Sequence, residues 1–298
     1  MNDAPLDCLV IGGGAAGLVA AVYLGRFRRK VVVVDAGASR LALIPKSRNV
    51  MGFPDGIAGK DLWVRMRQHA AGYDVSVEAA RIDALSRGEE GIFEASSGAR
   101  RWRARFVILA TGARDLPPEI NGLEESLASG VVRYCPVCDG YETEGQRVAV
   151  LGREIHGLRE SAFLSGFGNE VTWLSMDSHG KVAQDELARL RERKVAITGG
   201  EPRHIHCRPE SGVTVEMHDG QRHDFDVLYP ALGMMHASEL ATSLGARAQD
   251  DGQLEVDAHL QTNVDGLYAV GDVAVGLNQI NVAAGHAAIA ATAIHNRL

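Results

Sequence analysis

Short apolar runs alternate with amphipathic stretches along the whole chain, and this alternation predicts a mixed α/β fold. Residues 7–11 indicate a short buried strand, apolar positions from Leu18 to Leu24 follow a helical pattern, and residues 30–34 indicate a second strand. Together they form a complete strand–helix–strand unit. The other elements that the pattern predicts are helices at 60–71, 156–167 and 283–296 and strands at 148–152 and 171–174. Two more strands, within 103–112 and 262–272, each run into a glycine turn at the end of the range.

A glycine-rich turn, residues 12–17, joins the first strand to the first helix. In such a turn we expect Gly12 to make the tight bend, Gly14 to let the backbone approach a pyrophosphate, and Gly17 to let the helix lie close to the strand. The free N–H groups at the start of the helix would hold the phosphates. Asp35 ends the second strand, where a carboxylate can accept hydrogen bonds from ribose hydroxyls, so the unit predicts a dinucleotide site.

A second unit of the same kind begins at residues 148–152, after Pro117 and Pro118 break the regular structure. We interpret this break as a domain boundary. In the second unit Glu154 stands where the second glycine is wanted, and its side chain would crowd and repel a pyrophosphate. Arg153 would offset part of that charge. The second unit is therefore expected to bind a dinucleotide poorly.

The composition is typical of a globular protein, with 46% apolar and 23% charged residues among 298. A formal net charge of −7 disfavours nucleic acid, which needs a basic surface. The densest basic cluster, Arg26 with residues 28–30, is either a solvated helix end or a docking patch for an acidic electron carrier. We expect no secretion signal at the N-terminus, and we expect no membrane span because the longest apolar stretch, residues 282–294, is too short. We therefore expect a cytoplasmic protein that contacts neither membranes nor nucleic acid.

Cys135 and Cys138 form a C-x-x-C motif, whose spacing lets the two sulfurs close a small ring and exchange with other thiols. A zinc site would need two more ligands at paired spacing, and the adjacent His206 and Cys207 fit that requirement poorly. A plain buried pair is a third interpretation. In a cytosolic α/β chain we favour a catalytic dithiol, expect no metal, and take Cys8 and Cys207 as structural.

Asp139 follows the second cysteine directly. A carboxyl at this position can protonate a leaving thiolate or receive the proton of a thiol, so Asp139 is a candidate general acid–base group. Asp139-Gly140 is also a common turn sequence, and the two roles are compatible.

Four motifs, in their order and spacing, resemble the low-molecular-weight thioredoxin reductase family over nearly the whole chain. They are the glycine turn at 12–17, the Ala110-Thr111-Gly112 turn, the C-x-x-C run with its Asp-Gly pair at 135–140, and Gly271-Asp272. The resemblance implies two Rossmann-like dinucleotide-binding domains and a homodimer. The FAD-binding domain would be discontinuous, from residues 1–115 and 230–298, and a smaller NAD(P)-binding-like domain at 116–229 would be inserted into it and carry the C-x-x-C.

The resemblance also assigns roles to the side chains that take part in the chemistry. Cys135 and Cys138 would be the redox-active pair, Cys138 would be the sulfur nearest the flavin, and Asp139 would be the acid. His286, on the last predicted helix, would then act as an acid–base group near the flavin, tune N1 of the flavin, or be a packing residue.

The same resemblance implies an FAD site built from both ends of the chain. Gly271 and Asp272 correspond to the pair that holds the ribityl chain and phosphate, and residues 278–280 to the segment that meets the pyrimidine edge of the flavin. The expected FAD-binding residues are Gly12, Gly14, Ala15, Ala16, Gly17, Asp35, Asn49, Thr111, Gly112, Gly271, Asp272, Asn278, Gln279 and Ile280.

This chain departs from the family at the NADPH-binding motifs. Residues 152–157 replace an intact glycine turn, and Ser175-Met176-Asp177 stands where family members carry a His-Arg-Arg run that grips the 2′-phosphate. Asp177 would repel that phosphate. The Asp177 carboxylate would accept a hydrogen bond from a ribose hydroxyl of NADH. Glu154, however, would crowd the pyrophosphate of NADH as well. We therefore do not expect efficient use of NAD(P)H.

These features predict an FAD-dependent thiol–disulfide oxidoreductase that exchanges electrons between FAD, the Cys135–Cys138 pair and a thioredoxin-like protein or small dithiol. Residues 140–142 also resemble an offshoot of the family, dithiol oxidases that pass electrons to oxygen. Other offshoots take electrons from ferredoxin or a similar carrier. A redox-sensing flavoprotein without turnover is the third hypothesis. The residues leave the direction of electron flow open.

Overall fold

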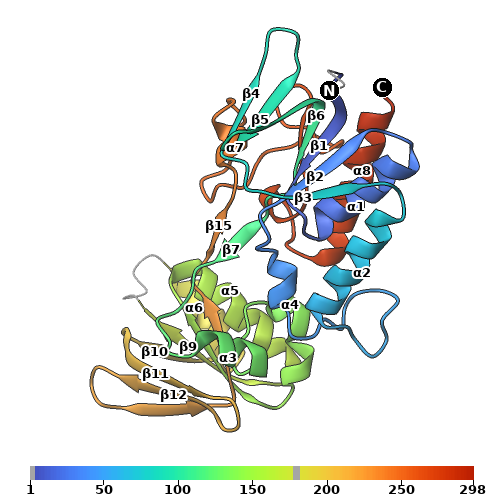
Figure 1. Cartoon of the computed structure of the whole chain (residues 1–298). Helices are drawn as coiled ribbons and strands as arrows, with labels where there is room; N and C mark the ends of the chain where they lie inside the picture. The colour runs from blue at the N-terminus through green and yellow to red at the C-terminus, as the bar shows by residue number, and fades with distance from the viewer. Residues whose placement is uncertain (1–3, 177–181) are drawn as a thin grey trace. The chain divides into compact units, whose positions relative to one another are not determined.

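The computed structural model describes residues 4–176 and 182–298, and the chain folds into two compact units (Figure 1). The first unit comprises Met1–Ile44, Val50–Arg114 and Met235–Leu298, and the second comprises Pro45–Asn49 and Asp115–Met234. The chain therefore passes between the units four times, after residues 44, 49, 114 and 234. Two short strands, β7 (Ala113–Asp115) and β15 (Met234–His236), pair where the last two of these crossings occur.

The first unit is built on a seven-stranded sheet with the order β3-β2-β1-β6-β5-β4, and β16 also pairs with β6. Pairing is parallel among β3, β2, β1, β6 and β16, and antiparallel in the β6-β5-β4 edge. The strands are β1 (Leu6–Ile11), β2 (Val31–Asp35), β3 (Ser76–Ala79), β4 (Ala84–Arg87), β5 (Phe93–Ser97), β6 (Arg100–Leu109) and β16 (Leu267–Ala269).

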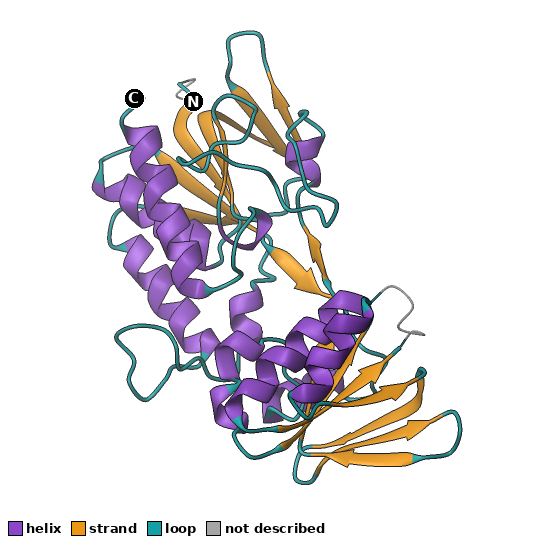
Figure 2. Ribbon diagram, turned by 180° about the vertical axis from the view of Figure 1, so that it is seen from behind, coloured by secondary structure: helices purple, strands orange, loops and turns teal. Residues whose placement is uncertain are grey.

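Small side chains let the helices of the first unit pack closely against each other and the sheet. The helices are α1 (Ala15–Arg26), η1 (Arg40–Leu43), α2 (Gly59–Ala71), α7 (Glu239–Thr242), η4 (Gly271–Val273) and α8 (Ile280–His295). The buried positions of α8 are mostly alanines and those of α1 include three alanines and a glycine, and both helices share one hydrophobic core with β1 and β2. Figure 2 shows these long helices gathered on one side of the sheet. This packing holds the glycine turn that precedes α1.

The second unit contains a four-stranded parallel sheet with the order β10-β9-β8-β14, next to a three-stranded antiparallel sheet, β11-β12-β13. Trp173 and Tyr229 are fully buried between the parallel sheet and its helices. The elements are α3 (Leu123–Ser129), α4 (Pro136–Asp139), η2 (Tyr141–Thr143), β8 (Arg147–Gly152), α5 (Glu154–Leu164), η3 (Ser165–Phe167), β9 (Glu170–Ser175), α6 (Gln184–Glu192), β10 (Ala196–Gly199), β11 (Pro202–Arg208), β12 (Gly212–Met217), β13 (Arg222–Phe225) and β14 (Val227–Ala231).

The α/β fold predicted from the sequence is confirmed, although the bounds of several predicted elements differ. The predicted strand at 262–272 is a strand only at β16, because the Thr262 hydroxyl binds Val264 N and Leu267 O and folds the preceding residues into a turn. Helix α8 begins at Ile280 and α5 at Glu154, both earlier than predicted. Across residues 4–176 and 182–298, no helix combines the length and apolar character needed to cross a membrane.

Candidate active site

The glycine turn before α1 is held against the residue after β6 by contacts that leave no room for side chains at Gly12 and Gly17. Gly12 has a φ of +112°, and a Cβ there would lie 2.2 Å from the carbonyl oxygen of Ala110. A Cβ on Gly17 would lie 1.9 Å from the carbonyl oxygen of Gly12. At Gly14 the nearest atom to an added Cβ is Ser39 Oγ, at 3.4 Å. The turn thus brings backbone close to backbone at Gly12 and Gly17, while Gly14 has more space.

Asp35, at the end of β2, ties this turn together. Its side chain is 7% exposed, and Oδ1 accepts hydrogen bonds from Gly13 N at 3.2 Å and Gly37 N at 3.1 Å. Oδ2 lies 3.4 Å from Arg67 Nη1, and Trp63 Nε1 donates to Gly13 O at 2.7 Å. Both Arg67 and Trp63 come from α2, and the sequence analysis missed them because nothing in the local pattern marks them.

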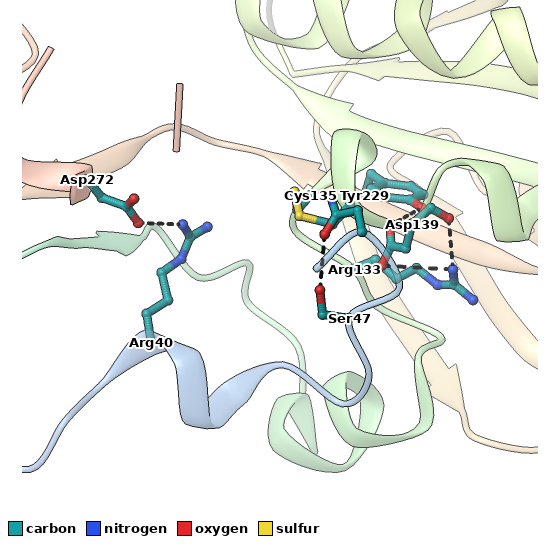
Figure 3. Close-up of a disulfide and its surroundings, with 9 residues drawn as sticks. Arg40, Ser47, Arg133, Cys135, Asp139, Tyr229 and Asp272 are labelled. Carbon is teal, nitrogen blue, oxygen red and sulfur yellow. Dashed lines mark hydrogen bonds and ion pairs between the residues drawn. A yellow bond between two sulfur atoms is a disulfide. The ribbon is translucent and has the colours of Figure 1, made fainter. Parts of the chain in front are cut away.

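The C-terminal part of the site approaches the same turn. Gly271 has a φ of +73°, and a Cβ there would lie 2.9 Å from Ala16 Cβ. Asp272 follows it, and its Oδ2 lies 3.1 Å from Arg40 Nη1 (Figure 3). The structure therefore brings Gly271 and Asp272 beside the start of α1, and it adds Arg40, which the sequence analysis also missed.

The remaining expected FAD-binding residues lie in three other places. Thr111 and Gly112 are both hydrogen-bonded to Ala237. Thr111 Oγ1 donates to Ala237 O at 2.6 Å, and Ala237 N donates to Gly112 O at 3.0 Å. Asn278 and Gln279 immediately precede α8, with Gln279 as its N-cap, and Ile280 and Ala15 pack on one small apolar cluster. Asn49 belongs to the stretch that packs with the second unit.

The first unit fits a bound FAD molecule. Backbone N–H groups of the turn at the start of α1 would hold the pyrophosphate, and Asp35 and Asp272 supply carboxylates at the ends of β2 and β16. On α8, His286 Nδ1 is buried without a hydrogen-bond partner among the described residues, and burial lowers the pKa of this imidazole while the nearby Asp272 opposes the shift. An unpartnered ring nitrogen next to this carboxylate is consistent with contact to a polar cofactor.

In the second unit, Cys135 and Cys138 form a disulfide. Cys135 caps the short helix α4, Pro136 occupies its first turn, and Cys138 N donates to Cys135 O at 2.9 Å. Both cysteines are half-buried, whereas Val137 between them is 45% exposed. Proline at the start of a helix sets the backbone for this tight turn, which keeps the two sulfurs within bonding reach.

Asp139, the last residue of α4, sits inside a group of polar side chains shown in Figure 3. The Tyr229 hydroxyl donates to Asp139 Oδ1 at 2.7 Å, and Arg133 Nη1 lies 3.9 Å from Asp139 Oδ2. Burial raises the pKa of the Asp139 carboxyl, while the hydrogen bond from Tyr229 and the charge of Arg133 act in the opposite direction. A carboxyl with a raised pKa beside a disulfide is suited to carry a proton.

The turn before α5 carries Arg153 and Glu154 at the positions where the turn before α1 has Gly13 and Gly14. Glu154 adopts a φ of +44°, a conformation that glycine accepts readily and glutamate does not. Arg153 Nη2 forms an ion pair with Glu201 Oε1 at 2.6 Å, and Trp173 Nε1 donates to Gly152 O at 3.0 Å. A Cβ on Gly157 would lie 2.2 Å from Trp173 Nε1, so the buried indole is packed against the turn.

The segment that corresponds to the family's phosphate-gripping run is described only in part. Ser175 ends β9 and is fully buried, and Met176 packs on an apolar cluster of the second unit. Asp177 lies outside the described residues.

The other two cysteines lie away from the disulfide along the chain and are free. Cys8 is fully buried in β1, and burial raises the pKa of its thiol. Cys207 is half-buried on β11, and burial raises the pKa of its thiol too. Among residues 4–176 and 182–298, no cluster of three or more His, Cys, Asp or Glu side chains could hold a metal ion.

Comparison with known proteins links this geometry to a family. The model of the pyridine nucleotide-disulphide oxidoreductases matches residues 6–287. Thioredoxin reductase from Bacillus subtilis (strain 168) is 27% identical over 97% of this chain and 94% of its own. The crystal structure of thioredoxin reductase from Streptococcus pyogenes MGAS5005 has a TM-score of 0.91 and 25% identity, covering 99% of this chain and 98% of that one. The structure of HlmI has a TM-score of 0.89 and 28% identity, covering 100% and 93%.

Disulfide chemistry coupled to a flavin is the class of activity that this fold and these residues define. The chain belongs to the pyridine nucleotide-disulphide oxidoreductase family. Within it, the chain is an FAD-dependent disulfide oxidoreductase of the thioredoxin reductase type.

Proposed function

We propose that this chain transfers electron pairs between bound FAD, the Cys135–Cys138 pair and an external dithiol or disulfide, and that it works as a homodimer in the cytoplasm. The observation that carries the proposal is the disulfide between these two cysteines, directly followed by the half-buried carboxyl of Asp139. FAD, when bound, supplies the two-electron chemistry that thiols alone lack. The residues proposed to hold it are the fourteen named from the sequence.

The reaction on the thiol side is a disulfide exchange. A partner thiolate attacks one sulfur of the Cys135–Cys138 disulfide, and the other sulfur leaves as a thiolate. The second partner thiolate then attacks the partner sulfur of this mixed disulfide and displaces this chain's cysteine as a thiolate, so the partner becomes a disulfide and this chain holds two thiols. Asp139 gives a proton to the leaving thiolate, or accepts one from a thiol when the reaction runs in the other direction. Two electrons and two protons pass between the partner and the cysteine pair in either direction.

The partner is a thioredoxin-like protein or a small dithiol. Relatives that are thioredoxin reductases support the first of these. Around the disulfide, Val137 is 45% exposed and Tyr141 is 73% exposed. Apolar side chains this accessible beside a reactive disulfide favour an apolar contact with the substrate.

NADPH is an inefficient reductant of this chain under our proposal. Glu154 places a carboxylate and a β-carbon where a pyrophosphate would need an open glycine, and the neighbouring Arg153 is paired with Glu201. Ser175 and Met176 offer no positive charge for a 2′-phosphate. The flavin therefore exchanges electrons with something other than NADPH.

The same observation at Glu154 favours a second candidate function, an oxidase of small dithiols that uses oxygen. A flavoprotein that does not use a nicotinamide needs another redox partner for its flavin, and oxygen or a carrier such as ferredoxin would serve. The chemistry at Cys135 and Cys138 is the same in both candidates, and only the partner of the flavin differs.

The test is the absorbance of the flavin in the purified protein, kept free of oxygen and titrated in turn with NADPH, NADH and dithiothreitol. We expect dithiothreitol to bleach the flavin and NADPH to leave it oxidised. Air should then restore the yellow colour if oxygen is the acceptor. Fast bleaching by NADPH would contradict our proposal about the second unit and would assign ordinary NADPH-dependent activity.

The role of the cysteine pair is tested by Cys138→Ser in the same titration. We expect this variant to keep its FAD and to lose reduction by dithiothreitol. Cys207→Ser is the matched control, because it removes a half-buried thiol outside the motif. Full reduction of the Cys138→Ser variant would contradict dithiol chemistry at this site and would favour a redox-sensing protein.

A further inference from the structure

The Asp139 carboxyl interacts with two side chains from other parts of the second unit, a tyrosine hydroxyl and an arginine guanidinium. The Tyr229 hydroxyl, on β14, donates to Oδ1 at 2.7 Å, and the Arg133 guanidinium, from the segment before α4, lies 3.9 Å from Oδ2. Arg133 Nη1 also donates to the backbone oxygen of Asp139 at 3.2 Å. The two carboxyl oxygens therefore face different partners, and this fixes the plane of the carboxyl group.

Packing alone does not explain a tyrosine at position 229. Strand β14 consists of Val227, Leu228, Tyr229, Pro230 and Ala231, all fully or almost fully buried. A phenylalanine would fill the same volume without bringing a hydroxyl into the core, where an unpaired hydroxyl is costly. The Tyr229 hydroxyl donates its hydrogen bond to the carboxyl of Asp139, the residue after Cys138. Its partner is therefore the group that we propose transfers protons at the disulfide.

Arg133 is also held in place. Its Nε donates to Gly130 O at 2.8 Å, and its side chain is 19% exposed. An arginine fixed at two backbone oxygens cannot swing away to solvent without losing both bonds. Its positive charge therefore stays close to the Asp139 carboxyl.

We infer that Tyr229 and Arg133 are positioning residues, which hold the Asp139 carboxyl in one orientation beside the Cys135–Cys138 pair and set its affinity for a proton. This inference rests on the proposed acid–base role of Asp139. The hydrogen bond and the positive charge both favour the ionised carboxyl, whereas burial favours the protonated one. The balance leaves a group that can take up and release a proton during each exchange.

Two further charged groups face the same carboxyl. Glu142, on η2, favours the protonated form, and Arg48, from the stretch Pro45–Asn49, favours the ionised form. These two residues also form an ion pair with each other, with Arg48 Nε 3.7 Å from Glu142 Oε1. Their effects oppose each other, so the larger influences on Asp139 come from burial, Tyr229 and Arg133.

The test follows the pH dependence of thiol reactivity in the full-length holoprotein. The cysteine pair is reduced with dithiothreitol without oxygen, the reductant is removed, and the rate of alkylation by iodoacetamide is measured between about pH 5 and 9. The inflection in the plot of alkylation rate against pH that disappears in Asp139→Asn is assigned to the Asp139 carboxyl. Without the hydrogen bond from Tyr229, Tyr229→Phe should move this inflection upward by about one pH unit.

Three companion variants separate positioning from a general effect on folding. Tyr268→Phe removes another buried hydroxyl, which binds Arg297 in the first unit, and should leave the inflection where it is. Arg133→Met should also move the inflection upward, and Arg133→Lys should move it less because it keeps the charge. In the Asp139→Asn background, Tyr229→Phe should have no further effect on the pH profile.

The outcomes distinguish this inference from the proposed function. If Asp139→Asn abolishes the inflection but Tyr229→Phe and Arg133→Met leave it unmoved, the positioning role is wrong and the acid–base role of Asp139 stands. If Asp139→Asn leaves the profile unchanged, the acid–base role fails and the inference fails with it. Should Tyr229→Phe not fold, the comparison of Arg133→Met with Arg133→Lys decides the question.

Discussion

Arg40 Nη1 lies 3.1 Å from Asp272 Oδ2, although 232 residues separate the two along the chain. Arg40 belongs to η1 after β2, and Asp272 to η4 after β16, so this ion pair joins the two ends of the chain within the first unit. The side chains are 28% and 21% exposed, which limits screening by water. The pair fixes the carboxylate that we propose meets the ribityl chain of FAD.

Replacement of Arg40 should therefore weaken the binding of FAD. For Arg40→Gln we expect the dissociation constant of FAD to rise about three- to tenfold, in line with the loss of one partly buried ion pair. Flavin fluorescence, which increases on release, measures this constant. Arg87→Gln is the control, because Arg87 pairs with the exposed Asp265 elsewhere in the unit. An unchanged constant in Arg40→Gln would show that Asp272 needs no such partner.

Two glycines on helices of the first unit should respond in opposite ways to replacement by alanine. In Gly17→Ala the new Cβ would meet the oxygen of Gly12 at 1.9 Å, so α1 must shift away from β1. We expect a loss of about 2 kcal/mol or more in the free energy of unfolding of the apoprotein. Gly285→Ala, on the exposed side of α8, meets nothing within 4 Å and should gain up to about 1 kcal/mol. Denaturant unfolding measures both, and equal effects would contradict this account of the turn.

Glu154 should be under backbone strain because of its φ of +44°. Glu154→Gly should raise the free energy of unfolding by about 1 kcal/mol relative to Glu154→Ala, since both remove the carboxylate but only glycine accepts this conformation freely. Urea unfolding of the two variants makes the comparison. If Glu154→Gly is less stable than Glu154→Ala, the positive φ at position 154 does not strain the backbone of the parent protein. The same pair, titrated with NADPH, shows whether an open glycine restores any reduction of the flavin.

Glu160, on α5, should make the stability of the protein depend on pH. Burial, with the nearby Asp115 as a smaller cause, raises the pKa of this carboxyl from 4.5 to about 8. The folded protein therefore binds more protons than the unfolded chain between these values, and stability should fall as the pH rises from about 4.5 to 8.

Glu160→Gln should flatten this dependence. The quantity to compare is the free energy of unfolding of Glu160→Gln minus that of the parent protein. We expect this difference to be larger at pH 8 than at pH 5 by roughly 1–3 kcal/mol. Thermal or urea unfolding at the two pH values gives the difference. Glu192→Gln, at an exposed position on α6, is the control. If the slope with pH stays the same in Glu160→Gln, this carboxyl does not govern it.

Local patterns of the sequence predicted the fold and the motifs of the chemistry. The apolar runs at 7–11 and 30–34 became β1 and β2, because short apolar runs rich in β-branched residues suit strands that are buried on both faces of a parallel sheet. The glycine turn and the C-x-x-C motif are also local, and they were recognisable because each needs particular residues at fixed spacing. The turn at 262–266 was misread as strand because a single hydroxyl, that of Thr262, redirects the backbone.

The side chains that complete the two sites were not predicted, because their partners are distant in sequence. Tyr229 meets Asp139 across 90 residues, and Arg67 meets Asp35 across 32. Nothing in the neighbourhood of Tyr229 marks it, since β14 has the composition of any buried strand. Only the position of β14 next to β8 in the sheet brings its hydroxyl to the carboxyl that follows Cys138.

The stretch Pro45–Asn49 packs with the second unit while both of its neighbours in sequence pack with the first. It brings with it Ser47, which is 4% exposed, and the Arg48 side chain that pairs with Glu142. The second unit is therefore not a contiguous cassette. A fragment cut at residues 115 and 234 would lack the buried Ser47 and the ion pair between Arg48 and Glu142. A chimera with a related protein would therefore have to exchange this short stretch together with residues 115–234.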